Sequence, residues 1–304
     1  MKSFYGQGKL LLTAEYVVLD GAKALAVPSN YGQSLQIEKG EIGKLKWTSF
    51  DELQNVWFES EFGLQNNEIL KQDKNDDPVS NRLLQILNTA KQLNSTFLAD
   101  LDGYTITTKL SFPKNWGLGT SSTLISNVAS WAKINPYQLL EATFGGSGYD
   151  IACARALKSL TFQLKGNEQI INTVDFSPVF KDHIYFVHLN QKQNSRDGIK
   201  QYRLNTSDLS STISEINNIT DCMIECESLI DFQKLMDQHE LLISEVIKQK
   251  PVKKMLFSDF KGSIKSLGAW GGDFVMIASE DDPTTYFKSK GYHTILTFSK
   301  MVKN

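Results

Sequence analysis

The stretch 111–133, SFPKNWGLGTSSTLISNVASWAK, starts with an extended pattern and ends with the spacing of a helix. Between these two parts lie a pair of glycines and then three hydroxyl residues, Thr120, Ser121 and Ser122. A plain turn needs one glycine, and a plain helix N-cap needs one hydroxyl. The stretch has more of both than a connection requires, which indicates a loop with a task of its own.

An anion-binding loop is the interpretation that uses this excess. Gly117 and Gly119 allow backbone conformations and a close approach that a side chain would block. The first amides of the following helix lack partners inside the helix and carry a partial positive charge, so loop and helix start together can cradle a phosphate. The loop is neither a Walker A sequence nor a dinucleotide fingerprint, because no Gly-Lys-Ser/Thr follows and the third glycine is missing. Taken alone, the stretch also fits a loop with an over-provided helix cap.

Three further segments combine glycines with a charged residue. Asp150 follows the cluster GGSG at 145–148 and is either a carboxylate beside a phosphate site or a helix-start acid that favours the helix dipole. The segment GAWGGDF at 268–274 has more glycines than a tight turn needs. Lys9 follows a glycine and precedes a strand pattern, and a lone lysine in such a place is usually a solvated surface residue.

Composition sets the broad class. The chain has 304 residues, 41% of them hydrophobic and 22% charged, which is typical of a globular protein of about two domains. A net charge of −2 gives no reason to expect nucleic acid as a partner, and no apolar run suits a signal peptide or a membrane span. Cys222 and Cys226 lie one helical turn apart, but no second pair completes a zinc site. We expect a cytoplasmic protein with no membrane partner.

The order of the expected elements indicates an α+β fold rather than regular βαβ alternation. Strands are predicted for GKLLLTAEYVVL at 8–19 and for YTITTKLSF at 104–112, and a helix for 79–93. Residues 207–250 are expected to form two helices with a break near 229–231. A boundary near NTVDFSPVFKD predicts two domains, 1–178 and 179–304.

Taken together and in this order, the four glycine-bearing segments resemble the motifs of the GHMP kinases, the family of galactokinase, homoserine, mevalonate and phosphomevalonate kinases. GKLLLTAEYVVLDGAKALAVP is similar to the first motif of that family, and GSGYD and GAWGGDF to its later ones. The phosphate loop Pro-x-x-x-Gly-Leu-Gly-Ser-Ser is matched from Pro113 to Ser122, with Leu118 between the glycines and Thr120 before the two serines. The resemblance implies a two-lobed fold with a ribosomal-S5-like N-terminal lobe that binds ATP and a ferredoxin-like C-terminal lobe.

The resemblance also implies roles for individual residues. Asp150 would accept the proton of the acceptor hydroxyl or orient the acceptor, and Lys9 would neutralise developing charge. Ser122, together with Glu141, would hold Mg²⁺. Residues expected to bind ATP are Pro113, Gly117, Leu118, Gly119, Thr120, Ser121, Ser122, Gly268, Gly271 and Gly272. Residues expected on the acceptor side are Glu15, Tyr16, Ser147, Gly148 and Arg196.

The branch of the family is less sharply indicated. Glu15-Tyr16, GSGYD and GGDF resemble the phosphomevalonate kinases, but the short chain argues against that branch. The offset of Glu141 from Asp150, in turn, does not match the mevalonate kinases. The sequence predicts an ATP- and Mg²⁺-dependent kinase for mevalonate or phosphomevalonate in isoprenoid precursor synthesis, acting as a monomer or homodimer on a small-molecule substrate. A sugar or homoserine kinase, an enzyme similar to the diphosphomevalonate decarboxylases, and a non-catalytic ligand sensor on the same fold remain alternatives.

Overall fold

The computed structural model describes residues 1–65, 68–72, 77–100, 102–166, 168–192, 195–204 and 208–303, without the side chains of residues 195 and 196. The chain forms two compact units, and each unit is made of three segments that alternate along the sequence. The first comprises Met1–Gly8, Tyr31–Lys114 and Leu118–Arg155, and the second comprises Lys9–Asn30, Asn115–Gly117 and Ala156–Asn304. The predicted contiguous boundary between residues 178 and 179 stays a prediction.

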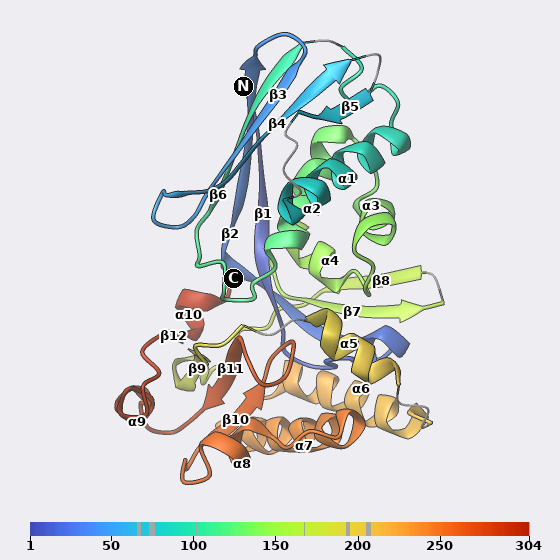
Figure 1. The fold of residues 1–304 in the computed structure, drawn as a ribbon. Helices are drawn as coiled ribbons and strands as arrows, with labels where there is room; N and C mark the ends of the chain where they lie inside the picture. The colour runs from blue at the N-terminus through green and yellow to red at the C-terminus, as the bar shows by residue number, and fades with distance from the viewer. Residues whose placement is uncertain are drawn as a thin grey trace. The chain divides into compact units, whose positions relative to one another are not determined.

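The first unit is a sheet covered by helices on one face (Figure 1). Its strands are ordered β5 (Glu68–Lys71), β4 (Val56–Gln65), β3 (Lys44–Phe50), β6 (Gly103–Leu110) and β2 (Ala24–Gly40). Strands β3 and β6 run parallel, and the other neighbours in this order run antiparallel. Strand β1 (Lys2–Leu11) also pairs with β2. The covering helices are α1 (Pro78–Leu93), α2 (Thr120–Ala132), α3 (Pro136–Thr143) and α4 (Tyr149–Arg155).

Alternation and helical spacing explain why this unit folds as it does. Strand β6 buries every second or third side chain, and α1 buries Leu83, Ile86, Leu87 and Ala90 along one stripe. These residues join one apolar core with the inner face of the sheet, including Trp47. Helix α1 also begins where the sequence predicts, because Asp77 caps Val79 and Ser80 and a proline occupies the first turn.

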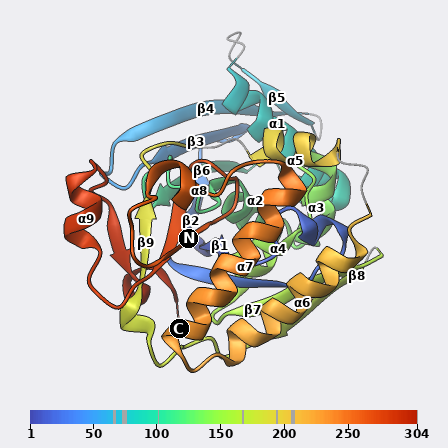
Figure 2. The same cartoon turned by 90° about the horizontal axis from the view of Figure 1, so that it is seen from below.

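The second unit is built on a four-stranded antiparallel sheet. Its order is β10 (Ser263–Ser266), β11 (Phe274–Ala278), β9 (Ile184–His188) and β12 (Ile295–Thr297). Helix α7 (Leu229–Ile247) packs on β10 and β11, and α6 (Ser210–Glu225) lies beside α7 (Figures 1 and 2). The two predicted helices are confirmed, but the break between them lies at residues 226–228 rather than near 229–231. Residues 229–231 form the first turn of α7, because Ser228 caps that helix.

The remaining elements of the second unit complete its periphery. The N-terminal part of β2 pairs with β7 (Leu160–Lys165), which pairs with β8 (Glu168–Thr173). Helices α5 (Ser195–Arg203), α8 (Val252–Leu256), α9 (Thr284–Ser289) and α10 (Phe298–Met301) and two short 3₁₀ turns, Val17–Asp20 and Lys181–His183, lie between or after the strands. None of the described helices combines the length and apolar character needed to cross a bilayer.

The predicted strand over residues 8–19 is wrong in its second half. Strand β1 ends at Leu11, and the chain then turns through Ala14 and Tyr16, whose φ angles are +66° and +65°. Positive φ is unfavourable for residues with a Cβ, and such residues persist only where the surrounding structure fixes them. Strand propensity therefore loses here to contacts made by distant parts of the chain.

Candidate functional site

The start of α2 presents backbone donors without a side-chain cap. Its N-cap is Gly119, with φ of +94°, and no side chain bonds to the first-turn amides. The φ of Gly117 is +67°, so both glycines of the loop hold conformations that other residues rarely adopt. Leu118 is fully buried, which leaves its backbone as the part that can meet a ligand. This geometry suits the predicted phosphate cradle.

The hydroxyl groups of this helix start differ in exposure. Ser121 is exposed and Thr120 is half-buried, whereas Ser122 is only 1% exposed. The Ser122 hydroxyl donates to the Gly119 carbonyl at 2.9 Å, and its oxygen keeps lone pairs that could bind a metal ion. Buried Thr123, which the sequence interpretation passed over, bonds Gln33 Oε1 at 2.8 Å and anchors the helix start to β2.

Asp150 lies in the first turn of α4, as the sequence predicts, and is half-buried. Its Oδ1 accepts a hydrogen bond from the Ile151 amide at 3.0 Å. Gly148, with φ of +91°, is packed so closely that a Cβ there would lie 3.0 Å from the Tyr137 ring. The pKa of Tyr137 is raised to about 12, mainly by burial; the Arg155 charge lowers it, and the nearby Asp150 carboxylate adds a smaller raising effect.

Glu141 is exposed on α3, one of the helices of the same unit. Among the described residues, no group of three or more histidine, cysteine, aspartate or glutamate side chains is arranged to hold a metal ion. A Mg²⁺ role for Glu141 therefore stays a prediction from sequence. The donors that do fit Mg²⁺ bound with phosphates are hydroxyl oxygens at the α2 start, because this ion takes few protein ligands and keeps waters and phosphate oxygens.

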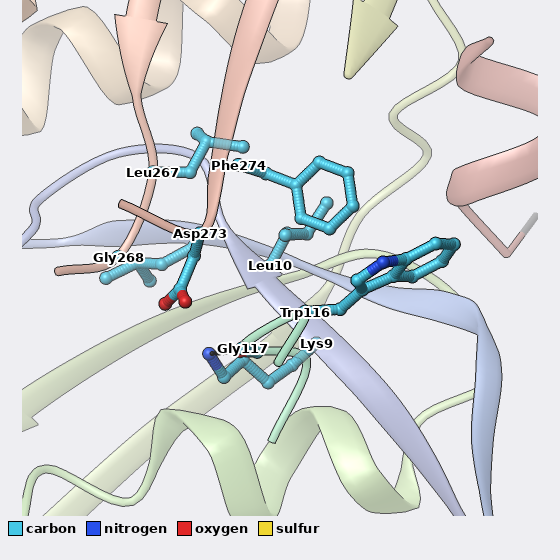
Figure 3. Close-up of a pocket in the computed structure, with 9 residues that line it drawn as sticks. Lys9, Leu10, Trp116, Gly117, Leu267, Gly268, Asp273 and Phe274 are labelled. Atoms are coloured by element: carbon cyan, nitrogen blue, oxygen red, sulfur yellow. Dashed lines mark hydrogen bonds between the residues drawn. The ribbon is translucent and has the colours of Figure 1, made fainter. Parts of the chain in front are cut away.

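In the second unit, Lys9 and a third carboxylate meet at Gly117. The Lys9 ammonium donates to the Gly117 carbonyl at 2.9 Å, and the two residues line a small pocket with Trp116, Gly268 and Asp273 (Figure 3). The Asp273 carboxylate points toward the Lys9 ammonium in this view. A Cβ on Gly117 would lie 2.3 Å from Asp273 Oδ2, so only glycine fits there.

Asp273 lines this pocket and is a candidate site residue that the sequence interpretation did not name. Its φ is +53°, and its backbone is fixed on both sides, because its amide donates to Gln191 O at 2.7 Å and its carbonyl accepts from Leu189 N at 2.8 Å. The sequence feature that could have pointed to Asp273 is its place in GGDF, directly after two glycines and before a strand. Backbone held in a rare conformation at a pocket is a feature of functional sites.

Aromatic residues support the segment before Gly117. Trp116 packs edge-on against Phe274 with ring centroids 5.4 Å apart, and His188 lies 5.1 Å from Phe274. The Asn190 amide donates to His188 Nδ1, so His188 Nε2 carries the proton and donates to Asn115 O at 3.1 Å. This contact fixes the start of the loop to the end of β9.

Glu15, expected on the acceptor side, lies instead in the core of the second unit. Only 1% of it is exposed, and its Oε1 lies 2.5 Å from the ammonium of Lys265, which is fully buried. The Ala14 amide donates to His239 Nε2 at 2.8 Å, and burial together with the Lys265 charge holds the pKa of His239 well below its usual range. His239 is thus neutral, and its 3.5 Å approach to Glu15 Oε2 is not an ion pair.

A second buried glutamate completes this charge cluster, which comprises Glu15, His239, Glu240 and Lys265. Glu240 accepts two hydrogen bonds from Ser266: the Ser266 amide donates to Oε2 at 2.9 Å and the Ser266 hydroxyl to Oε1 at 2.8 Å. Burial raises the pKa of Glu240 to about 7, although Lys265 and the Ser266 bonds lower it. A protonated Glu240 leaves Glu15 and Lys265 as a balanced pair, which is the electrically neutral form of the cluster.

The glycine-rich loop after β10 starts at this cluster. Gly268 and Gly271 have φ of +65° and +88°, and Gly268 lines the Lys9 pocket. The Trp270 amide lies 3.4 Å from the Tyr16 hydroxyl, which places Tyr16 against the loop.

Of the other residues expected on the acceptor side, Ser147 and Gly148 lie just before Asp150 in the first unit. The side chain of Arg196 falls outside the described residues, although its backbone belongs to α5.

No protein-family model and no curated protein sequence matches the chain. Solved structures do match it over its whole length. A mevalonate kinase aligns with a TM-score of 0.72 at 16% identity, covering 100% of both chains. The chain has the GHMP kinase fold. This confirms the α+β architecture and the resemblance seen in the four motifs.

Two other matches show how wide the range of substrates on this fold is. The Streptococcus pneumoniae phosphomevalonate kinase in complex with phosphomevalonate and AMPPNP aligns with a TM-score of 0.69 at 14% identity, covering 95% of each chain. The Lactococcus lactis galactokinase complexed with galactose aligns with the same TM-score and identity, covering 100% of this chain and 95% of its own. Fold likeness at this identity does not select a substrate.

Proposed function

We propose that the chain is an ATP-dependent small-molecule kinase that phosphorylates mevalonate or phosphomevalonate in isoprenoid precursor synthesis. The observation that carries the proposal is the start of α2. Its N-cap is a glycine and no side chain caps its first amides, so these amides can donate hydrogen bonds to an anion. The order of the four motifs and the fold support the same activity.

ATP is the proposed phosphate donor, with its phosphates at Gly117–Ser122 and the loop Gly268–Gly272 closing over the phosphates or the acceptor. The backbone amides of the α2 start provide hydrogen bonds and a positive dipole end, which suit a polyphosphate although residues 117–122 contain no basic side chain. Mg²⁺ fits the hydroxyl donors of this helix start, with Ser122 as its proposed ligand. When bound, the ion neutralises charge on the phosphate oxygens.

Asp150 is the proposed base. A carboxylate that is half-buried at a helix start stays accessible, and it can accept the proton of an attacking hydroxyl or orient the acceptor. Lys9 is proposed to neutralise developing charge, since its ammonium is held at a fixed point by the Gly117 carbonyl. Tyr16, Ser147, Gly148 and Arg196 stay proposed acceptor-side residues, and Glu15 is proposed to position its neighbours rather than to touch the substrate. The proposed setting is cytosolic, with a monomer or homodimer.

A screen for ATP consumption tests the proposal directly. Mevalonate, phosphomevalonate, galactose and homoserine are offered separately, and both ADP and phosphorylated product are measured. We expect turnover with one of the first two. Release of CO₂ with phosphate from diphosphomevalonate would instead indicate a decarboxylase, and turnover with galactose or homoserine would reassign the acceptor. Binding of a ligand without any turnover would identify a sensor.

A further inference from the structure

Tyr16 lies where three segments meet that are far apart in the sequence. Its hydroxyl faces the Trp270 amide of the glycine-rich loop at 3.4 Å. Its ring packs on Tyr202 of α5, with the centroids 5.7 Å apart. One turn earlier on the same helix, a Cβ added to Gly198 would lie 2.6 Å from the Tyr16 hydroxyl and 3.0 Å from ring atom Cε1. Residues 198 and 202 share one helix face, so this face of α5 packs on Tyr16.

The far end of α5 is fixed independently of Tyr16. The Tyr202 hydroxyl donates to Asp20 Oδ2, and Arg203 forms an ion pair with Asp20 Oδ1 at 2.8 Å. Tyr202 is only 3% exposed, although most residues of the helix are polar. Two aromatic rings and one acid therefore attach this mostly polar helix to the turn that carries Tyr16, and Gly198 provides the space into which the Tyr16 hydroxyl fits.

The conformation of Tyr16 is maintained from the buried side of the turn. Tyr16 and Ala14 both have positive φ, which other parts of the structure must stabilise. The Ala14 amide donates to His239, and Glu15 is paired with Lys265, the residue before Ser266 at the end of β10. The charge cluster thus holds both the turn that carries Tyr16 and the strand that leads into the glycine-rich loop.

We propose that Tyr16 is a positioning residue that links α5 to the glycine-rich loop, with Gly198 as the socket for its hydroxyl. Displacing the ring from this socket moves the point against which the Trp270 amide rests, so α5 and the loop respond together. The consequence for ligand binding at the loop rests on the proposed kinase function. The structural coupling does not depend on it.

A double-mutant cycle tests the coupling. Gly198→Ala adds one methyl group, which on helix propensity alone should slow amide exchange in α5, because alanine favours helix over glycine. We expect the opposite: hydrogen exchange in both 195–203 and 267–273 becomes faster by at least about tenfold, because the methyl group meets the Tyr16 hydroxyl. Tyr16→Phe removes that oxygen, so the variant carrying both changes should exchange within about threefold of Tyr16→Phe alone.

The controls separate this coupling from general damage to the helix. Gln201→Ala, at an exposed position of α5, should leave exchange in 267–273 unchanged. Exchange is measured on the protein without substrate, so the result stands whether or not the kinase activity is found. Where the acceptor is known, its KM should rise in Gly198→Ala, and the KM of the double variant should equal that of Tyr16→Phe alone. Exchange in Gly198→Ala as in wild type, loosening of α5 without the loop, or no rescue by Tyr16→Phe would each overturn the proposal.

Discussion

Replacing buried Glu240 by glutamine should stabilise the protein at neutral and alkaline pH but not at acid pH. The pKa of Glu240 is raised by burial from 4.5 to about 7. Between these values the folded protein keeps a proton that the unfolded chain has released. The contribution of Glu240 to stability is therefore present below pH 4.5 and lost as the pH rises through about 7.

The size of the effect follows from the two pKa values. The difference between 4.5 and about 7 is about 2.5 units, and at 1.36 kcal/mol per unit this gives roughly 3 kcal/mol. Glutamine removes the titration while keeping the contacts, because its amide oxygen can accept from the Ser266 amide and its amide nitrogen can donate to the Ser266 hydroxyl. The cluster with glutamine is electrically neutral at every pH at which Glu15 and Lys265 are both charged.

Urea unfolding of wild type and Glu240→Gln at a series of pH values measures this directly. The free energy of unfolding of the variant, minus that of wild type, should increase by about 3 kcal/mol between about pH 4.5 and pH 8. His239 acts in the opposite sense, since its lowered pKa costs stability as the pH falls below 6.5. It is present in both proteins, so the subtraction largely removes its contribution.

The matched control is Glu245→Gln, at an exposed position of the same helix α7. Its effect should stay within about 0.5 kcal/mol across the pH range, as is usual for surface substitutions. A difference between Glu240→Gln and wild type that is constant with pH, or that shrinks toward alkaline pH, would refute the raised pKa of Glu240.

Three substitutions test the proposed kinase site. Ser122→Ala should lower kcat more than it weakens ATP binding, because a metal-bound hydroxyl acts mainly in the transition state; an unchanged kcat at ordinary Mg²⁺ concentrations would remove Ser122 from the metal site. Gly119→Val should abolish nucleotide binding in calorimetry while circular dichroism shows a folded protein, because the φ of +94° excludes a β-branched residue; near-normal ATP affinity would contradict the phosphate cradle. Asp150→Asn should reduce kcat by at least about 10²-fold with a hydroxyl acceptor such as mevalonate. The loss should be smaller with a phosphate monoester, because its second pKa of about 6 leaves the attacking oxygen mostly ionised at neutral pH. Full activity with a hydroxyl acceptor would exclude Asp150 as the base.

The sequence by itself determined those parts of the protein whose signals are local. Two glycines before hydroxyl residues and a helical pattern predict the start of α2, and the structure has a glycine cap there, because φ preferences and unpaired helix amides act within a few residues. Asp150 at the start of α4 and the division of residues 207–250 into two helices follow from equally local patterns. The ordered set of such signals was enough to indicate the fold.

Only the tertiary structure decided what the polar residues between these signals do. Glu15 follows a strand pattern and resembles a substrate residue, yet it is buried against Lys265, which lies 250 positions away in the sequence. Asp273 lies against Gly117, and Tyr16 against Gly198, and both pairs are also far apart in the sequence. Propensity and spacing describe a residue and its near neighbours, whereas the burial of a charge and the fit of a hydroxyl against a glycine depend on which distant segments pack together.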